Sequence, residues 1–218
     1  MERKAHPSGG QAGPMIILLI AGSFLSGSLM FSYWLGLVGN KNLKVVGDGN
    51  PGALNLWKAS GYKFGIYGIL LDFLKGYLPL IWVIGSDYDQ GYLIVPLAIA
   101  PIAGHAFSPF LKGKGGKAIA VTFGVWSALT GFEVSLVYAV ILALLAAVTR
   151  LIYKSRPKST EADGLQVVSG MLLLSLYLYM RMFSSAILWV WFGNFVILVY
   201  THRFEMAAWL KRMFNKGT

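Results

Sequence analysis

The chain has 218 residues, of which 56% are hydrophobic and only 13% are charged, and its formal net charge is +10. This composition is too apolar for a water-soluble domain of this length, and several runs of about 20 apolar residues are long enough to cross a bilayer. The basic residues lie in short segments between apolar runs, which favours a membrane topology signal and argues against a nucleic-acid partner. The chain contains no cysteine, so thiol chemistry is excluded, and its three histidines and nine acidic residues leave few options for a metal site. We expect no cofactor.

The apolar runs predict an all-α, polytopic membrane protein with about seven transmembrane helices. Residues 1–14 are polar and glycine-rich and are predicted to form a disordered tail. Residues 15–203 are predicted to form one membrane domain, and residues 204–218 a basic tail at the membrane interface. The predicted helices cover residues 15–38, 63–84, 92–107, 118–130, 134–153, 165–180 and 184–201. Within the first helix, Ser23 and Gly27 are spaced for close contact with another helix.

The distribution of basic residues predicts the orientation of these helices. If the N-terminus lies outside, fifteen of the 19 Lys and Arg residues fall in cytoplasmic segments. Because basic residues near helix ends are retained in the cytoplasm, this count predicts an outside N-terminus and a cytoplasmic C-terminus. Both glycine-rich loops described next would then face the cytoplasm.

The first glycine-rich loop lies in the stretch of residues 47–58, which reads Gly-Asp-Gly-Asn-Pro-Gly-Ala-Leu-Asn-Leu-Trp-Lys. This density of glycine and proline predicts a tight loop, with a helix starting near Ala53. Backbone N–H groups ahead of a helix suit an anionic oxygen, and Lys44 and Lys58 add charge on either side. The alternative is a plain turn between two membrane helices.

The second glycine-rich loop contains Lys112, Lys114 and Lys117 among three glycines. It lacks the spacing of a nucleotide-binding P-loop, and no strand precedes it. Anion binding by a backbone nest together with a lysine is one interpretation, and a plain positively charged cytoplasmic loop is the other. His105 precedes this loop and His202 ends the last helix. Each is a candidate base or phosphate-binding group, with a structural role as the alternative.

Asp72 and Lys75 lie inside the second predicted helix at positions i and i+3, and therefore share one face. Charged side chains are costly in hydrocarbon unless they are paired or face the bundle interior. The pair could fix the packing of the helices, or it could bind substrate.

Taken together, the motifs resemble those of the bacterial acyl-phosphate-dependent glycerol-3-phosphate acyltransferases, and the resemblance covers almost the whole chain after Pro14. Four segments carry it: Gly22-Ser23-Phe24-Leu25-Ser26-Gly27; Gly47-Asp48-Gly49-Asn50-Pro51-Gly52-Ala53-Leu54-Asn55; Asp72-Phe73-Leu74-Lys75-Gly76; and Gly104-His105-Ala106-Phe107 followed by Lys114-Gly115-Gly116-Lys117. The resemblance implies a seven-helix enzyme of the bacterial cell membrane.

The chain departs from the family pattern at several positions. Leu25 stands where proline is usual, Asp48 where the family has serine, Lys58 where it has arginine, Ala118 where it has glycine, and Glu205 where it has asparagine. The serine and arginine positions are important to catalysis in the family, so these changes bear on activity.

The implied reaction moves a fatty acyl group from acyl phosphate to a hydroxyl of glycerol 3-phosphate and gives lysophosphatidate for phospholipid synthesis. The implied partners are these two substrates and membrane lipids. The alternatives are a divergent member with another acceptor, or a non-catalytic membrane protein that binds lipids or anions. The candidate catalytic residues are His202, His105, Lys58 and Asp48. The candidate substrate-binding residues are Lys44, Gly49, Asn50, Gly52, Asn55, Lys114, Gly115, Gly116, Lys117, Ser184 and Glu205.

Asp48 and Glu205 place two carboxylates where phosphates are expected. At about 4 Å and an effective dielectric near 20, the repulsion is on the order of 4 kcal/mol, enough to prevent useful binding. We therefore expect Asp48 to pair with Lys44 or Lys58. The alternatives are an acceptor that is not a phosphate ester, or a bridging divalent cation.

Overall fold

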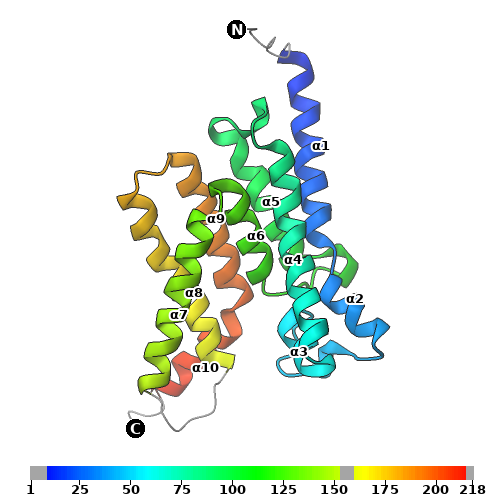
Figure 1. Cartoon of the computed structure of the whole chain (residues 1–218), viewed down its shortest axis with the longest axis vertical. Helices are drawn as coiled ribbons and strands as arrows, with labels where there is room; N and C mark the ends of the chain where they lie inside the picture. The colour runs from blue at the N-terminus through cyan, green and yellow to red at the C-terminus, as the bar shows by residue number, and fades with distance from the viewer. Residues whose placement is uncertain (1–8, 153–159, 215–218) are drawn as a thin grey trace.

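The computed structural model describes residues 9–152 and 160–214, and every regular element in these ranges is helical (Figure 1). The α-helices are α1 (Gly9–Ser28), α2 (Phe31–Val38), α3 (Ala53–Ser60), α4 (Tyr62–Val83), α5 (Ile94–Ala106), α6 (Ile119–Thr130), α7 (Glu133–Ile152), α8 (Thr160–Met180), α9 (Ser185–Thr201) and α10 (Arg203–Phe214). Short 3₁₀ turns cover Leu43–Val45, Asp87–Asp89, Gly91–Leu93 and Pro109–Leu111.

The predicted all-α, multi-pass membrane fold is confirmed. In the described residues, five segments are long and apolar enough to span a bilayer, and they cover residues 13–38, 62–83, 91–111, 133–151 and 163–180. Helix α9 qualifies as a sixth only together with α10, from which it is separated by a bend of 63°. Helix α6 is apolar but has only 12 residues. All seven predicted segments are therefore helical, and five or six of them have the dimensions of a membrane span.

The predicted helix boundaries agree with the structure to within two residues from the second helix onward, except that α8 begins five residues earlier than expected. Helix α1 begins at Gly9, so the part of the predicted disordered tail that follows residue 8 is helical. Residues 1–8 and most of the polar loop predicted before α8 lie outside the described residues.

The first predicted helix is interrupted, because Met30 adopts a non-helical backbone with φ −101° and ψ 62°. The break leaves the carbonyl oxygen of Leu29 free, and Lys75 Nζ donates a hydrogen bond to it at 2.5 Å. Asp72 lies 2.8 Å from Lys75 Nζ and accepts a hydrogen bond of 2.6 Å from Ser32 at the start of α2. Both charged residues are at most 3% exposed. The geometry thus supports the packing role for this pair, which satisfies the polar groups of the break.

Small residues bring the helix backbones into contact. A Cβ atom added to Gly27 of α1 would lie 2.0 Å from the carbonyl oxygen of Pro101 in α5, and one added to Gly104 would lie 2.2 Å from that of Phe24. Ser23 is 3% exposed on the same face of α1. The predicted close contact at Ser23 and Gly27 is therefore confirmed, and it fixes α5 and the loop that follows α5 against α1.

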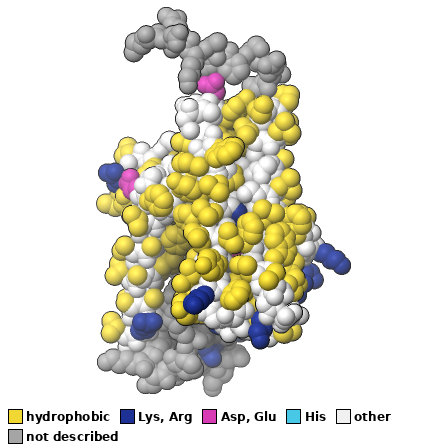
Figure 2. Space-filling view, turned by 45° about the vertical axis from the view of Figure 1, so that its right-hand side comes forward, with side chains coloured by type: hydrophobic (Ala, Val, Ile, Leu, Met, Phe, Trp, Pro, Cys, Tyr) yellow, Lys and Arg dark blue, Asp and Glu magenta, His cyan; other side chains and the backbone are white. Residues whose placement is uncertain are grey.

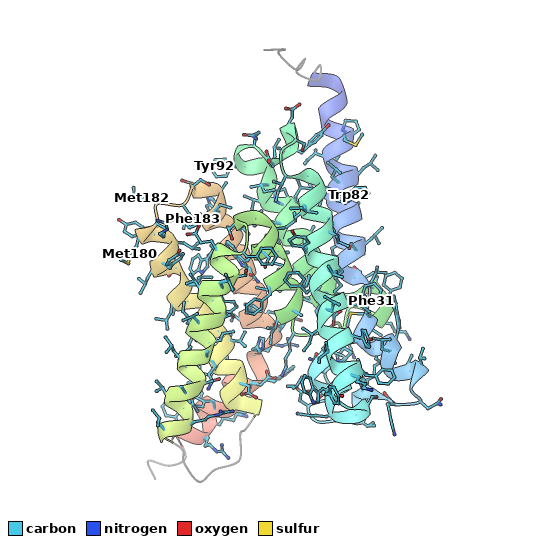
Figure 3. All side chains as sticks on the ribbon, viewed as in Figure 1. Phe31, Trp82, Tyr92, Met180, Met182 and Phe183 are labelled. Atoms are coloured by element: carbon cyan, nitrogen blue, oxygen red, sulfur yellow. The ribbon has the colours of Figure 1, made fainter. Side chains whose placement is uncertain are left out.

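The polar and apolar surfaces are separated along the long axis. Helices α2, α3 and α10 lie at the lower end in Figure 1, and α1 begins at the upper end. Most of the visible Lys and Arg side chains lie near the lower end, below a surface covered by apolar side chains (Figure 2). Trp82 and Met182, 87% and 85% exposed, lie in the upper half (Figure 3). This arrangement is typical of a protein whose apolar surface contacts lipid.

Candidate active site

The first glycine-rich loop is organised by its own side chains. Asp48 Oδ1 accepts hydrogen bonds from the backbone N–H of Asn50 at 3.2 Å and from Nδ2 of Asn55 at 2.7 Å. Asn55 Nδ2 also donates to the carbonyl oxygen of Asn50 at 2.9 Å. Helix α3 begins at Ala53, as predicted, and Gly52 is its N-cap without a side-chain capping bond. The loop is thus shaped by Asp48 and Asn55 before any ligand binds.

Several backbone donors of this loop remain available. Gly47 and Gly49 have φ values of +57° and +73°, a region that glycine adopts without strain. Within the described residues, the amides of Gly47, Asp48 and Gly52 donate to no backbone oxygen. The first N–H groups of α3 also lack intrahelical partners, as in any helix. Together these donors form a surface suited to an anion, as predicted for this stretch.

Two lysines lie beside the loop. A Cβ atom built on Gly47 would lie 3.3 Å from Lys58 Nζ and 2.6 Å from Asn55 Oδ1, so both side chains reach the face of this glycine. Lys44 Nζ instead lies 5.5 Å from the centroid of the Tyr33 ring, where a cation–π contact holds it. Lys58 is therefore placed to add charge to the loop, while Lys44 lies further aside.

The amides of residues 113–116 do not form the backbone nest that was one of the two interpretations of the second glycine-rich loop. Four successive amides, those of residues 113–116, donate to carbonyl oxygens of residues 105–111 at 2.9 to 3.1 Å. Because these donors are already used, they are not available to an anion. Lys112 and Lys114 are exposed in this loop. The loop offers the site a lysine side chain, and Gly115 and Gly116 allow it to pack closely on His105.

His105 lies directly beneath the second loop. A Cβ atom added to Gly116 would lie 2.3 Å from His105 Nε2, and one added to Gly115 would lie 1.8 Å from the His105 carbonyl oxygen. The imidazole is 4% exposed, and its Nδ1 has no hydrogen-bond partner among the described residues. His105 thus supports the loop that carries Lys117.

Lys117 joins three parts of the chain. Its Nζ contacts Asp48 Oδ2 of the first loop at 2.5 Å and also pairs with Glu205 Oε1 in the first turn of α10. The ion pair expected at Asp48 therefore exists, but the expected partners Lys44 and Lys58 are wrong. The sequence could not indicate that Lys117 is the partner of Asp48, because 69 positions separate the two residues. The two added carboxylates thus both pair with the same lysine.

The ion pairs shift the pKa values of Asp48 and Lys117. Partial burial favours the neutral form of Asp48, but the hydrogen bond and charge of Lys117 outweigh it, so the pKa of Asp48 lies below its ordinary value. Burial likewise disfavours the charged form of Lys117, but its bonds to Asp48 and Glu205 raise its pKa above the ordinary value. Asp48 and Lys117 are therefore both charged at neutral pH.

His202 lies at the junction of α9 and α10, beside this cluster. Its Nδ1 lies 2.9 Å from the carbonyl oxygen of Leu198. Because a carbonyl only accepts hydrogen bonds, the neutral ring carries its proton on Nδ1 and a lone pair on Nε2. His202 is 1% exposed. The hydroxyl of the neighbouring Thr201 donates a hydrogen bond of 3.4 Å to the carbonyl oxygen of Lys117. His202 therefore has the tautomer of a base within the same site.

The structure does not bring Ser184 to this site. Ser184 is the N-cap of α9, at the opposite end of that helix from His202. It lines a pocket of about 360 Å³ together with Ile84, Asp89 and Tyr92.

The structure adds Gly164 of α8 to the candidate site. A Cβ atom at this glycine would lie 2.8 Å from Glu205 Cβ and 3.3 Å from His202 Cδ2. No motif in the sequence indicated this glycine. Among residues 9–152 and 160–214, no three His, Asp or Glu side chains gather closely enough to hold a metal ion.

The fold defines a multi-pass helical membrane protein in which two glycine-rich loops and the start of α10 meet at Lys117. A sequence model described as glycerol-3-phosphate acyltransferase matches residues 17–212. The chain belongs to the glycerol-3-phosphate acyltransferase family.

Individual relatives agree with this assignment. The chain is 40% identical over 200 residues to glycerol-3-phosphate acyltransferase 1 of Thermotoga maritima, which covers 88% of this chain and 97% of the relative. It is 29% identical over 201 residues to the glycerol-3-phosphate acyltransferase of Endomicrobium trichonymphae, which covers 92% and 94% of the two chains.

Solved structures share the fold. The crystal structure of PlsY (YgiH), an integral membrane glycerol 3-phosphate acyltransferase, matches in its glycerol 3-phosphate form with a TM-score of 0.77. The identity is 24%, and the match covers 90% of this chain and 92% of the other. The lysophosphatidic acid form of the same protein matches with a TM-score of 0.76.

Proposed function

We propose that this chain transfers an acyl group from an acyl phosphate to a hydroxyl of glycerol 3-phosphate, and so produces lysophosphatidate for phospholipid synthesis. Family membership supports the reaction class. The observation that carries the proposal is the meeting of three chain segments at Lys117: the open amides of the first loop, the second loop, and the start of α10 beside His202. These are the groups needed to hold two phosphate-bearing substrates together.

The chemistry follows from the donor. The hydroxyl oxygen of glycerol 3-phosphate attacks the carbonyl carbon of the acyl phosphate, a new C–O ester bond forms, and the bond between that carbon and the phosphate oxygen breaks. Inorganic phosphate leaves with the bonding electron pair. Because phosphate is a good leaving group, the protein mainly has to position the two anions and stabilise developing charge. The first-loop amides, Lys58 and Lys117 would do this.

The hydroxyl proton needs an acceptor. We assign this role to Nε2 of His202, because Nδ1 faces the Leu198 carbonyl and the ring lies beside the Lys117 cluster. His105 was the other candidate, and its ring is packed against Gly116. We assign His105 a supporting role under the second loop.

The site end of the bundle would face the cytoplasm, with the N-terminus outside. The concentration of Lys and Arg at the lower end in Figure 2 supports this orientation. An acyl chain would then lie along the apolar helices while its phosphate reaches the basic loops, and membrane lipids would surround the bundle.

The test is an assay of purified protein with palmitoyl phosphate and glycerol 3-phosphate. We expect lysophosphatidate and inorganic phosphate in equal amounts, and no product when palmitoyl-CoA replaces the acyl phosphate. Folded protein that forms no lysophosphatidate would reject the proposal. Consumption of palmitoyl phosphate with another alcohol, but not with glycerol 3-phosphate, would instead establish a different acceptor.

A further inference from the structure

We propose that Glu205 is a positioning residue that holds Lys117 until the phosphate of glycerol 3-phosphate replaces it, so that a neutral acceptor does not release this lysine. The inference rests on the proposed function, which makes phosphate the ligand of Lys117. It concerns the contact between α10 and the second loop, where this chain has a carboxylate.

The two carboxylates on Lys117 are held very differently. Asp48 has three partners, because it also accepts hydrogen bonds from Asn55 Nδ2 and from the backbone of Asn50. Glu205 pairs only with Lys117 through Oε1, and its Oε2 is buried without a hydrogen-bond partner among the described residues. A buried carboxylate oxygen without a partner is costly. Glu205 therefore forms the weaker of the two ion pairs with Lys117, and it is the carboxylate that an incoming anion would displace.

The surroundings of Glu205 link its release to the catalytic base. Glu205 lies in the first turn of α10, directly after the 63° bend that follows α9, and His202 lies at that bend. Gly164 of α8 packs against both side chains. His202 is 1% exposed, and the side chains of Lys117 and Glu205 are 17% and 12% exposed. Movement of the first turn of α10 would free the Lys117 cation and uncover His202 together.

Charge explains why phosphate can make this exchange and a neutral alcohol cannot. Lys117 with Asp48 and Glu205 carries a formal net charge of −1, and a phosphate that replaces Glu205 gains the lysine, the open first-loop amides and Lys58. Phosphate offers more charge and more acceptor oxygens than one carboxylate. Glycerol offers neither and leaves the Lys117–Glu205 pair intact. The pair thus contributes to the choice of acceptor.

The first measurement is the KM for glycerol 3-phosphate of Glu205→Gln, which keeps the shape of the side chain and removes its charge. We expect this KM to fall by about three- to tenfold, the scale of a partly exposed ion pair. Asp48→Asn is the matched variant. It removes the charge of the carboxylate that Asn50 and Asn55 hold in place, and it should not lower the KM for glycerol 3-phosphate. A folded Glu205→Gln protein with an unchanged or higher KM would overturn the inference.

The second measurement does not need turnover. Acetic anhydride labelling of Lys117, followed by mass spectrometry, is compared with labelling of the exposed Lys114 in the same loop. We expect Lys117 to react several-fold faster in Glu205→Gln than in the wild type, and inorganic phosphate to slow the reaction again. Equal Lys117 labelling in both proteins would overturn the inference even if lysophosphatidate is formed. If no lysophosphatidate is formed but the labelling changes as expected, the proposed function fails and the Lys117–Glu205 contact stands.

If Glu205→Gln does not fold, labelling of the wild-type protein at two salt concentrations still tests the proposal. Raising the salt concentration to about 0.5 M weakens partly exposed ion pairs. We expect it to speed labelling of Lys117 more than labelling of Lys114, and an equal response of the two lysines would reject the proposal.

Discussion

Lys117 Nζ and Asp48 Oδ2 meet at 2.5 Å across 69 positions of the chain and join the two glycine-rich loops. We predict that Lys117→Ala weakens substrate use far more than it disturbs folding. Charge-assisted hydrogen bonds contribute roughly 1.5–3 kcal/mol, or about 10- to 150-fold in binding. The loss should reach at least this range, because the variant also leaves Asp48 and Glu205 without their cation. The measurement is kcat/KM for glycerol 3-phosphate, with Lys114→Ala as the control from the same loop. Wild-type kinetics in Lys117→Ala would show that this lysine only marks topology.

The lowered pKa of Asp48 predicts how stability depends on pH. A carboxyl group whose pKa is lower in the folded than in the unfolded state contributes stability above its unfolded pKa, and this contribution is lost as the pH falls through the folded pKa. Asp48→Asn should therefore lower the Tm above about pH 5, by an amount that shrinks towards zero as the pH falls through the folded pKa of Asp48. Asp87→Asn, an exposed carboxyl in another loop, is the control. A Tm difference that does not change with pH would contradict the ion-pair account.

Much of the fold could be predicted from the sequence because hydrocarbon imposes simple rules. Runs of apolar residues of bilayer length gave the helices, and the glycine density at residues 47–52 gave the loop and the start of α3 at Ala53. The break at Met30 was missed, because the apolar pattern continues through it and the polar groups that stabilise it come from α4.

Several residues of the candidate site could be named from the sequence, but their contacts could not. Local patterns indicated the loops, Lys117 and His202, while the partner of Asp48 depends on how α10 and the second loop fold back. The backbone nest was also a local inference. It failed because these amides donate to carbonyl oxygens at the end of α5 and in residues 108–111, contacts that the sequence could not place.

The buried pair of Asp72 and Lys75 predicts a large effect on stability. Lys75→Met leaves the Asp72 carboxylate without its cation and the Leu29 carbonyl without a donor, and breaking such a pair costs about 3–5 kcal/mol. The double variant Asp72→Leu with Lys75→Met should recover part of this loss, because no buried charge then lacks a partner. Thermal unfolding in detergent measures both. A Lys75→Met protein that is as stable as the wild type but inactive would assign the pair to substrate binding.

Gly116 should not tolerate even a methyl group. A Cβ atom there would lie 2.3 Å from His105 Nε2, so Gly116→Ala must displace the imidazole or the loop that carries Lys117. Overpacking of this kind costs about 1–3 kcal/mol, and we expect activity to fall more than the Tm indicates, because the lysine moves. Gly22→Ala in α1, where no atom lies within 4 Å, is the matched control. Equal activity in both variants would show that the loop position is not critical.

The proposed orientation can be tested directly because the wild-type chain has no cysteine. Val45 near the first loop and Met182 between α8 and α9 are 80% and 85% exposed and lie outside the candidate site. A cysteine at residue 45 should react with a membrane-impermeant maleimide only from the cytoplasmic side, and one at residue 182 only from outside. If the two cysteines react from the reverse sides, the orientation is the opposite of the proposed one. If both react from one side, an even number of membrane crossings separates residues 45 and 182, and the seven-helix topology is wrong.

The contacts at the break between α1 and α2 also bear on how the chain enters the membrane. During synthesis, the Leu29 carbonyl and Ser32 leave the ribosome 40 or more residues before Asp72 and Lys75, their partners in the finished protein. In hydrocarbon, only a continuous helix then gives the Leu29 carbonyl oxygen a hydrogen-bond donor. That donor is the backbone N–H of Tyr33, four residues further on. We therefore expect the first segment to insert as one continuous helix, and the break at Met30 to form when α4 docks beside it. Formation of the corner that carries the first glycine-rich loop is in this way tied to the arrival of the second membrane span.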